Sequence, residues 1–374
     1  MKKSLFYILI LLNSLSLLAQ DDANNTRETI YRGMPTLSSN PTSGTGVGAT
    51  GVMIYYADED SSPSQALVLA QYTNTDSYSV FAVNKMFFSH DKWQSNTFGG
   101  ILYNNSNYAI PGEFFPVLPP SINPDDGIAY NVTIYVLIQQ FLYSLEKNFY
   151  IGGQFYYVDQ QFYANNVAGQ IFLNEKGIEN SKRAGYGVTF QYDSRRVSEK
   201  FYAYDSSFID LTVSQFPEFL GIDQAYANAI LNARKYIRGF KSDDVFAMQL
   251  YGQYSSEKTP DGALAGLGAR NVLRGFAIGQ YKTRNMLAAQ GEYRYRITST
   301  SFRLAAFGGY ANMSGGSYGN GAGNDREEDN GDYYSGGLGV HYILQKKQNL
   351  DYRVNVAYTN KKETSIYASI NQAF

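Results

Sequence analysis

The sequence predicts an all-β fold: a transmembrane, antiparallel, up-and-down β-barrel, with sixteen as the expected number of strands. Three observations predict it: an export signal, an unusual composition, and a long-range alternation of apolar and polar residues. The composition combines 34 Tyr and 23 Phe with one Trp, 35 Gly and no Cys, at a mean hydropathy of −0.33. Because a barrel strand shows lipid only every second residue, a window average hides its hydrophobicity.

The N-terminus has the order of a secretory signal peptide. Lys2 and Lys3 precede the apolar run 5–12, and a small-residue site follows near Ala19. This order predicts cleavage near Ala19 or Gln20, and the apolar run is too short for a membrane-spanning helix. We therefore expect an exported protein that resides in the outer membrane of a Gram-negative cell.

The composition excludes several classes of function. An exported chain without cysteine uses neither disulfides nor thiol chemistry. A net charge of −2 gives no electrostatic basis for binding nucleic acid. The two histidines, His90 and His341, are far apart in sequence, so a transition-metal site is not expected. We expect no metal, no other cofactor, no catalytic residues and no enzymatic activity.

The alternation has a period of two residues, which is the period of a β-strand. Near the C-terminus Leu350, Tyr352 and Val354 share one face, and Asp351 and Arg353 share the other. A soluble β-sandwich shows the same alternation, so the pattern alone does not identify a membrane barrel.

Aromatic residues distinguish the two folds. Phe149, Phe155 and Tyr157 lie near predicted strand ends, where membrane barrels carry interfacial girdles. The last alternating segment also ends on Phe374, as the final strand of a bacterial outer-membrane barrel does. We therefore favour the membrane barrel over the sandwich.

The alternation also sets the strand order and the domain organisation. It predicts strands at residues 46–58, 64–74, 78–88, 94–103, 128–143, 148–160, 183–193, 200–215, 225–238, 243–256, 285–298, 301–313, 333–345, 350–360 and 364–374. Long connections are expected at 104–127, 160–182, 216–224, 257–284 and 314–332. Two strands lie between each of these connections and the next, so all five should lie on the same side of the barrel. These are fifteen strands, an odd number, whereas single-chain bacterial barrels have an even number of strands. We therefore divide the chain into a signal peptide (1–20), a short segment holding a candidate first strand (21–45) and the barrel (46–374).

Two neighbouring segments carry a family signature. Residues 272–276 read Val-Leu-Arg-Gly-Phe and residues 290–294 read Gln-Gly-Glu-Tyr-Arg. Together they resemble the loop and strand of the BamA/TamA-type outer-membrane assembly superfamily, also called the bacterial surface antigen family. Other segments similar to that family follow in its order, at 185–188, 192–196, 337–340, 350–352 and 371–374. The resemblance therefore extends over most of the chain.

The resemblance implies particular site residues. In this superfamily an Arg-Gly-aromatic tip folds back into the lumen, and its arginine pairs with an acidic residue of the barrel wall. Here it implies a lumen latch of Arg274, Gly275 and Phe276, with Glu292 as the partner. A charge that leaves water is costly unless it is paired, so such a contact should be structurally important.

The end of the chain also resembles the family. The closing residues are similar to the C-terminal β-signal that such barrels present to their assembly machinery, with Ile370, Gln372 and Phe374 as the recognition residues.

The chain departs from the family pattern in two ways. The family usually has an acidic residue two positions after the Phe of the next strand, whereas Phe307 is followed by Gly308 and Gly309. Only the short segment 21–45 separates the predicted signal from the predicted barrel, so we expect a member without periplasmic POTRA repeats.

The resemblance implies a role in the insertion or translocation of proteins, or of other molecules, at the outer membrane. Its partners would be the outer-membrane lipid bilayer, unfolded client proteins and periplasmic factors. The alternative is a passive channel or structural barrel that keeps the fold without the assembly role. Its lumen would be lined by Asp210, Glu292, Arg294, Arg296, Asp351 and Arg353.

Two other motifs do not carry a function. Residues 46–51 spell Gly-x-Gly-x-x-Gly, but a dinucleotide site needs a strand before the motif and a helix after it. We expect a glycine-rich strand there. The acidic segment 324–332 lacks the ligand order of an EF-hand, so we expect a solvated outer loop.

Overall fold

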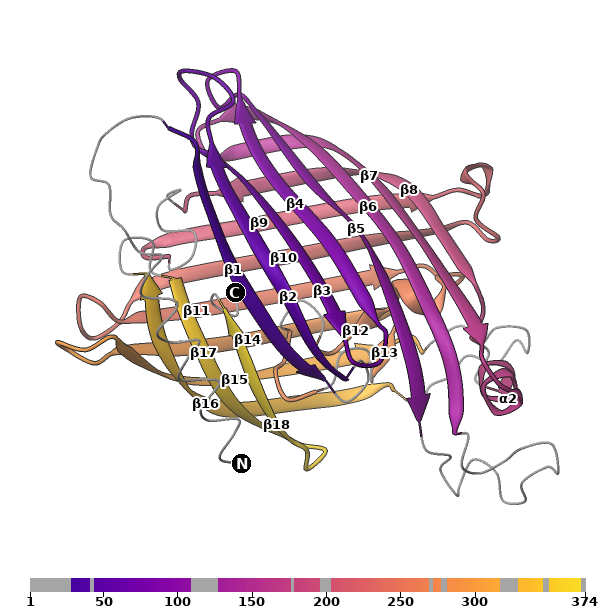
Figure 1. Cartoon of the computed structure of the whole chain (residues 1–374). Coiled ribbons are helices and arrows are strands. Elements are labelled where there is room, and N and C mark those ends of the chain that lie inside the picture. The colour runs from indigo at the N-terminus through magenta and orange to yellow at the C-terminus, as the bar shows by residue number, and fades with distance from the viewer. Residues whose placement is uncertain are drawn as a thin grey trace. The chain divides into compact units, whose positions relative to one another are not determined.

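The computed structural model describes residues 28–40, 44–108, 127–175, 178–195, 203–268, 272–276, 281–316, 329–345 and 350–370 (Figure 1). The predicted signal peptide, 1–20, lies outside these residues, as do Gln372 and Phe374 of the predicted β-signal. The chain forms two compact units. Unit 1 comprises Met1–Gln139 and Val158–Asn180, and unit 2 comprises Gln140–Tyr157 and Ser181–Phe374. Each unit is described by itself.

In the described part of the chain, sixteen long strands form a sheet in which they follow one another in sequence order, with antiparallel neighbours. Their bounds are β1 Ile30–Asn40, β2 Gly44–Tyr55, β3 Ser64–Thr73, β4 Tyr78–Phe88, β5 Trp93–Tyr108, β6 Ile128–Glu146, β7 Phe149–Ala164, β8 Ser181–Asp193, β9 Ser206–Phe216, β10 Tyr226–Arg238, β11 Val245–Ser255, β14 Asn285–Arg296, β15 Phe302–Ser314, β16 Gly331–Gln345, β17 Leu350–Thr359 and β18 Thr364–Ile370. The predicted all-β class and strand number are confirmed. Strand β1 is the one that parity required within 21–45.

The remaining differences from the predicted strands are local. Strand β9 begins at Ser206 rather than at residue 200, because Asp205 adopts a positive φ of 40° and its carboxylate accepts a hydrogen bond from Arg238 at 2.6 Å. The glycine-rich motif at 46–51 lies within β2, as expected. Most of the acidic segment 324–332 lies outside the described residues.

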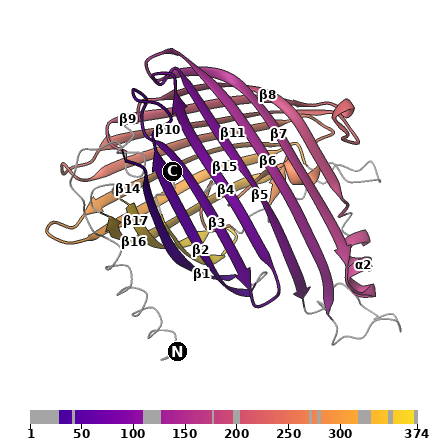
Figure 2. The same ribbon diagram turned by 45° about the horizontal axis from the view of Figure 1, so that its top comes forward.

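Among the residues of unit 1 that the structure describes, there is one α-helix, which the alternation could not predict. Helix α2 (Val167–Glu175) follows β7 in the connection expected at 160–182 (Figure 2). Asn166 starts it, because its side-chain oxygen accepts the backbone N–H of Gly169 at 2.7 Å, as an N-cap residue does. Ala168 then packs against Ile128 of β6. Within the described residues no helix has the length and apolar character needed to cross a membrane.

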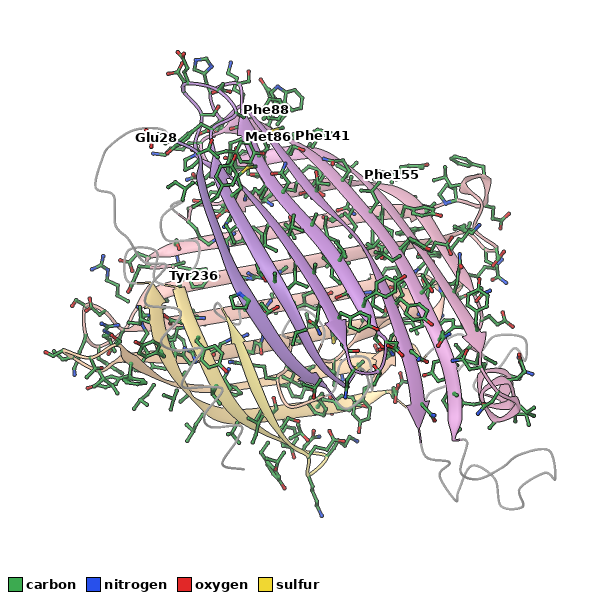
Figure 3. All side chains as sticks on the ribbon, viewed as in Figure 1. Glu28, Met86, Phe88, Phe141, Phe155 and Tyr236 are labelled. Atoms are coloured by element: carbon green, nitrogen blue, oxygen red, sulfur yellow. The ribbon has the colours of Figure 1, made fainter. Side chains whose placement is uncertain are left out.

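Strand β17 of unit 2 alternates between buried polar side chains and exposed apolar side chains. Along β17, Asp351 and Asn355 are completely buried, whereas Val356 is 47% exposed and Tyr358 is 56% exposed. Phe155 of β7, labelled in Figure 3, also belongs to the exposed set. This order is the reverse of a soluble sandwich, and it is typical of a sheet whose outer face meets lipid.

Candidate functional site

The connection between β11 and β14 returns to the buried face of unit 2. Its first part pairs with its last part through two short strands, β12 (Ala265–Gly266) and β13 (Lys282–Thr283). Between them lies the latch segment, which we define as residues 272–276. Its residues are almost entirely buried: Leu273 is 0% exposed and Phe276 is 1% exposed. A loop segment buried to this degree is a packed structural element.

Arg274 forms the ionic contact of the latch segment. Its Nη2 atom lies 2.6 Å from Oε2 of Glu292 on β14, and the two side chains are 4% and 0% exposed. Arg294 donates from Nε to Oε1 of the same carboxylate, also at 2.6 Å. Glu292 therefore lies between two guanidinium groups, and both of its oxygens are engaged. Such a buried arrangement is favourable only when each charge keeps its partner.

Phe307 provides a second contact for Arg274. The guanidinium carbon lies 3.6 Å from the centre of the Phe307 ring, which is a cation–π geometry. Phe307 is the direct cross-strand partner of Glu292 in the pairing of β14 with β15. One cross-strand pair thus supplies both an anion and an aromatic face to the same arginine.

Gly275 fits its position because of both its backbone and its lack of a side chain. Its φ is +120°, and a Cβ atom there would lie 2.6 Å from Cγ2 of Thr359. Its carbonyl accepts a hydrogen bond from Oγ of Ser365 at 2.8 Å. Since Thr359 ends β17 and Ser365 lies near the start of β18, the latch segment touches the last hairpin of the chain.

Leu273 and Gln290 connect the latch segment to the sheet on its other side. The Leu273 N–H donates to Oε1 of Gln290 at 3.2 Å, and Gln290 donates to Gln249 of β11 at 2.6 Å. Gln249 in turn donates to Asn232 of β10 at 2.9 Å. This chain of amides holds the latch segment to three strands without using a charge.

Phe276 anchors the end of the latch segment in an aromatic cluster. Its ring packs edge-on against Tyr281 and Tyr333, with ring centres 5.7 and 5.6 Å away. The ammonium of Lys361 lies 5.1 Å from the Tyr333 ring. Partial burial raises the pKa of the Tyr281 hydroxyl, and the nearby carboxylates of Glu363 and Asp329 raise it further. The hydroxyl therefore stays neutral at physiological pH.

A second group of charges lies on the same buried face. Arg303 of β15 donates to Asp351 of β17, and Nδ1 of His341 lies 4.0 Å from the other oxygen of that carboxylate. Nε2 of His341 is 3.2 Å from the side-chain oxygen of Asn355. Arg353 is also buried on this face, at 5% exposure.

The structure brings the four predicted latch residues, Arg274, Gly275, Phe276 and Glu292, into one site. Of the residues predicted to line a lumen in the alternative function, four are buried and two are half-buried: Glu292, Arg294, Asp351 and Arg353 in the first group, and Asp210 and Arg296 in the second. Ile370 lies at the end of β18. Among the described residues there is no group of three or more His, Asp or Glu side chains that could hold a metal ion.

Several site residues were not predicted from the sequence. The sequence predicts a lumen-lining position for Arg294, and the spacing of two residues from Glu292, which puts both on one face, is the signal for the pair. The sequence gives no signal that Phe307 itself contacts the latch segment. The contacts of Thr359 and Ser365 have no sequence signal, because they depend on where the loop returns to the sheet.

A sixteen-stranded antiparallel meander with a charged loop packed on its buried face defines a class, the large β-barrels. Solved structures agree with this class. The chain is similar to BamA from Haemophilus ducreyi lacking POTRA domains 1–3, with a TM-score of 0.55 and 13% identity, over 92% of this chain and 70% of that one.

The chain is also similar to two CdiB structures. CdiB from Escherichia coli gives a TM-score of 0.65 at 10% identity over 93% of this chain, and CdiB from Acinetobacter baumannii gives 0.57 at 10% identity over 92%. The chain spans 63% and 60% of those two chains. No protein-family model matches the sequence, and no curated protein sequence matches it. The predicted resemblance to the BamA/TamA-type superfamily is thus confirmed at the level of the fold.

Proposed function

We propose that this protein is an outer-membrane β-barrel that assists the insertion or translocation of other proteins at that membrane. The proposal rests on the fold shared with BamA and CdiB and on the exposed apolar face of the sheet. A lipid bilayer would cover that face, because burying apolar surface away from water is favourable.

The observation that carries the proposal is the buried pair of Arg274 and Glu292. The superfamily that the sequence resembles uses an Arg-Gly-aromatic tip paired with a wall carboxylate, and this chain has that contact at 2.6 Å. Burying a guanidinium and a carboxylate costs desolvation free energy. The contact is therefore a more specific indicator of function than the strand pattern that many barrels share. Unfolded client proteins and periplasmic factors are the proposed partners, and no enzymatic step is involved.

The alternative is a passive channel or structural barrel. It keeps the fold and the lipid partner but gives the latch segment only a packing role. The two functions differ in what the latch segment does, so they can be separated in one experiment.

That experiment reconstitutes the full chain in liposomes and follows the insertion of an unfolded client barrel added from outside. We expect the wild type to accelerate insertion and Arg274→Ala to lose most of the acceleration. Arg238→Ala is the matched control, because it removes an exposed arginine that contacts Asp205 at 2.6 Å. Planar-bilayer conductance of the same proteins is measured in parallel.

Two results would overturn the insertion role. Liposomes with and without the wild-type protein would take up the client at the same rate, or Arg274→Ala would accelerate uptake as well as the wild type does. A large, steady wild-type conductance together with either result would establish the channel.

A further inference from the structure

Strands β2 to β5 of unit 1 have apolar residues near the centre of both faces, whereas β17 of unit 2 has one polar and one apolar face. Directly paired residues of antiparallel strands lie on the same face, so the register assigns each side chain to a face. On one face the row Tyr72, Tyr78 and Tyr103 lies at one end, and Phe88 pairs with Trp93 at the other. Small and aliphatic residues follow the tyrosine row, and a polar row with Asn84 and Thr97 lies nearer to the Phe88–Trp93 pair. Aromatic rows at both ends are typical of the lipid-facing side of a membrane sheet.

The opposite face has polar residues at both ends and an apolar centre. Gln71 pairs with Ser79 at one end, and Lys85 pairs with Gln65 and Asn96 at the other. Between them lies what we call the inner apolar patch, which consists of Val52, Leu67, Leu69, Phe81, Val83 and Phe98. Polar rims around an apolar centre on the side away from lipid mark a binding surface rather than a second membrane face.

The patch is accessible and ordered. Val83 is 40% exposed and the other five side chains are half-buried. The rings of Phe81 and Phe98 stack with centres 5.8 Å apart, which gives the patch a fixed aromatic floor. From Lys85 to Phe81 the strand extends roughly 13 Å, at ~3.3 Å per residue. This length suits an extended hydrocarbon chain.

Lys85 is the sole charged residue of β2 to β5, and Arg32 of β1 pairs with Val52 at the side of the patch. The ammonium of Lys85 lies 5.2 Å from the centre of the Phe87 ring, on the same face as the patch and at its end. A positive charge at the end of an apolar strip complements an anion that carries an apolar tail.

We propose that the inner apolar patch binds a long-chain carboxylate, a free fatty acid, with its head group at Lys85 and its hydrocarbon chain along Val83, Phe81 and Leu69. The binding requires the fold but not the insertion role, so the two proposals can fail independently. An apolar segment of a client polypeptide could cover the inner apolar patch but would provide no anion for the ammonium of Lys85.

The single tryptophan of the chain, Trp93, makes a fluorescence test direct. In a Trp93→Phe background, Phe98→Trp and Leu69→Trp place a reporter in the patch, and Ile101→Trp places one on the opposite face. The full-length variants are reconstituted into phosphatidylcholine vesicles. Brominated phosphatidylcholine should quench the Ile101→Trp reporter and leave both patch reporters bright.

Brominated stearate is then titrated at low membrane fraction. We expect saturable quenching of both patch reporters. Lys85→Gln should raise the half-saturating concentration about tenfold, the loss expected for one charge-assisted hydrogen bond. The exposed turn variant Lys92→Gln should leave it unchanged, and brominated stearyl alcohol should quench as weakly as stearate does in Lys85→Gln.

Other outcomes overturn the proposal. Quenching of the patch reporters that does not saturate, or that is equal for the acid and the alcohol, would show partition without a site. Equal affinities in the wild type and Lys85→Gln would exclude the proposed head-group contact. Quenching of both patch reporters by brominated phosphatidylcholine would show that this face meets the bilayer.

Discussion

The guanidinium of Arg274 lies 3.6 Å from the centre of the Phe307 ring. Phe307 is on β15, next to strand β14, which carries Glu292, the ionic partner of Arg274. Because Phe307 and Glu292 are direct cross-strand partners, their contacts to Arg274 are geometrically coupled. The aromatic ring thereby provides a contact for the cation on β15, where the resembled family usually has a second acidic partner. In this chain Arg274 is thus held by one carboxylate, that of Glu292, and by one aromatic ring, that of Phe307.

Removing Arg274 should destabilise the latch segment strongly. Arg274→Ala leaves Glu292 with Arg294 as its remaining ionic contact and removes the contact to Phe307. Breaking a buried ion pair from one side costs ~3–5 kcal/mol. We expect a lower unfolding temperature in detergent and new protease cleavage within 257–284, detected by mass spectrometry.

Arg238→Ala is the control for this loss. Arg238 contacts Asp205 at the same 2.6 Å, but the two side chains are 59% and 55% exposed. An exposed pair contributes ~0–1 kcal/mol, so this variant should unfold almost as the wild type does. If Arg274→Ala and Arg238→Ala lowered the unfolding temperature equally, burial of the latch pair would not be the source of its stability.

The contact between Arg274 and Phe307 should appear as a measurable coupling. In a double-mutant cycle with Phe307→Leu and Arg274→Lys, we expect a coupling of about 0.5–2 kcal/mol in the free energy of unfolding. Lysine keeps the charge but loses the planar group that stacks on a ring. Additive effects within error would mean that the ring only fills space.

Gly275 should not tolerate a side chain, for two separable reasons. Gly275→Ala places a Cβ 2.6 Å from Cγ2 of Thr359 and forces alanine to a φ near +120°. We expect a loss of about 1–3 kcal/mol from the backbone alone, measured by denaturant titration. Thr359→Ser removes the clashing methyl group but keeps the hydroxyl, which accepts the backbone N–H groups of Lys361 and Glu363.

The double variant Gly275→Ala with Thr359→Ser should therefore recover only the clash and keep the backbone cost. Gly308→Ala is the matched control, since the nearest atom to its Cβ position is the carbonyl oxygen of Ser335 at 3.6 Å. Equal losses at 275 and 308 would contradict the specific role of Gly275.

The sequence determined the strands well because each one alternates over ten or so residues. Strand β4 was predicted with its observed bounds, Tyr78–Phe88. The even number of strands expected for a closed antiparallel barrel predicted one further strand within 21–45, where β1 lies, although the alternation of residues did not show it. Helix α2 was missed because it depends on one capping residue, Asn166, and on local packing against β6.

The site was only partly predictable, for a physical reason. Arg274 and Glu292 were paired through a family resemblance, whereas the contacts of Ser365 and Thr359 arise when a loop returns to strands about 90 residues away, a separation that pattern reading does not span. The sequence does not indicate the inner apolar patch, because β3 is apolar on both faces and the alternation then does not show which side chains form an inner surface.

Gly309 gives the prediction in which the structure and the family pattern disagree. By the family pattern, an acidic residue there would strengthen the latch. In this chain a Cβ at 309 would lie 2.6 Å from Cβ of Gln290 and 2.9 Å from Cδ1 of Leu273, which is fully buried. Gly309→Asp should therefore displace Leu273 and cost about 1–3 kcal/mol of overpacking, seen as a lower unfolding temperature and faster proteolysis of 257–284.

Leu273→Ala is the variant that makes room. Alone it should destabilise the protein, because it empties a packed position. Combined with Gly309→Asp it should cost less than the sum of the two single variants, since the carboxylate could then occupy the vacated space near Arg274. A Gly309→Asp protein as stable as the wild type would show that Leu273 does not fill the position of the missing acid.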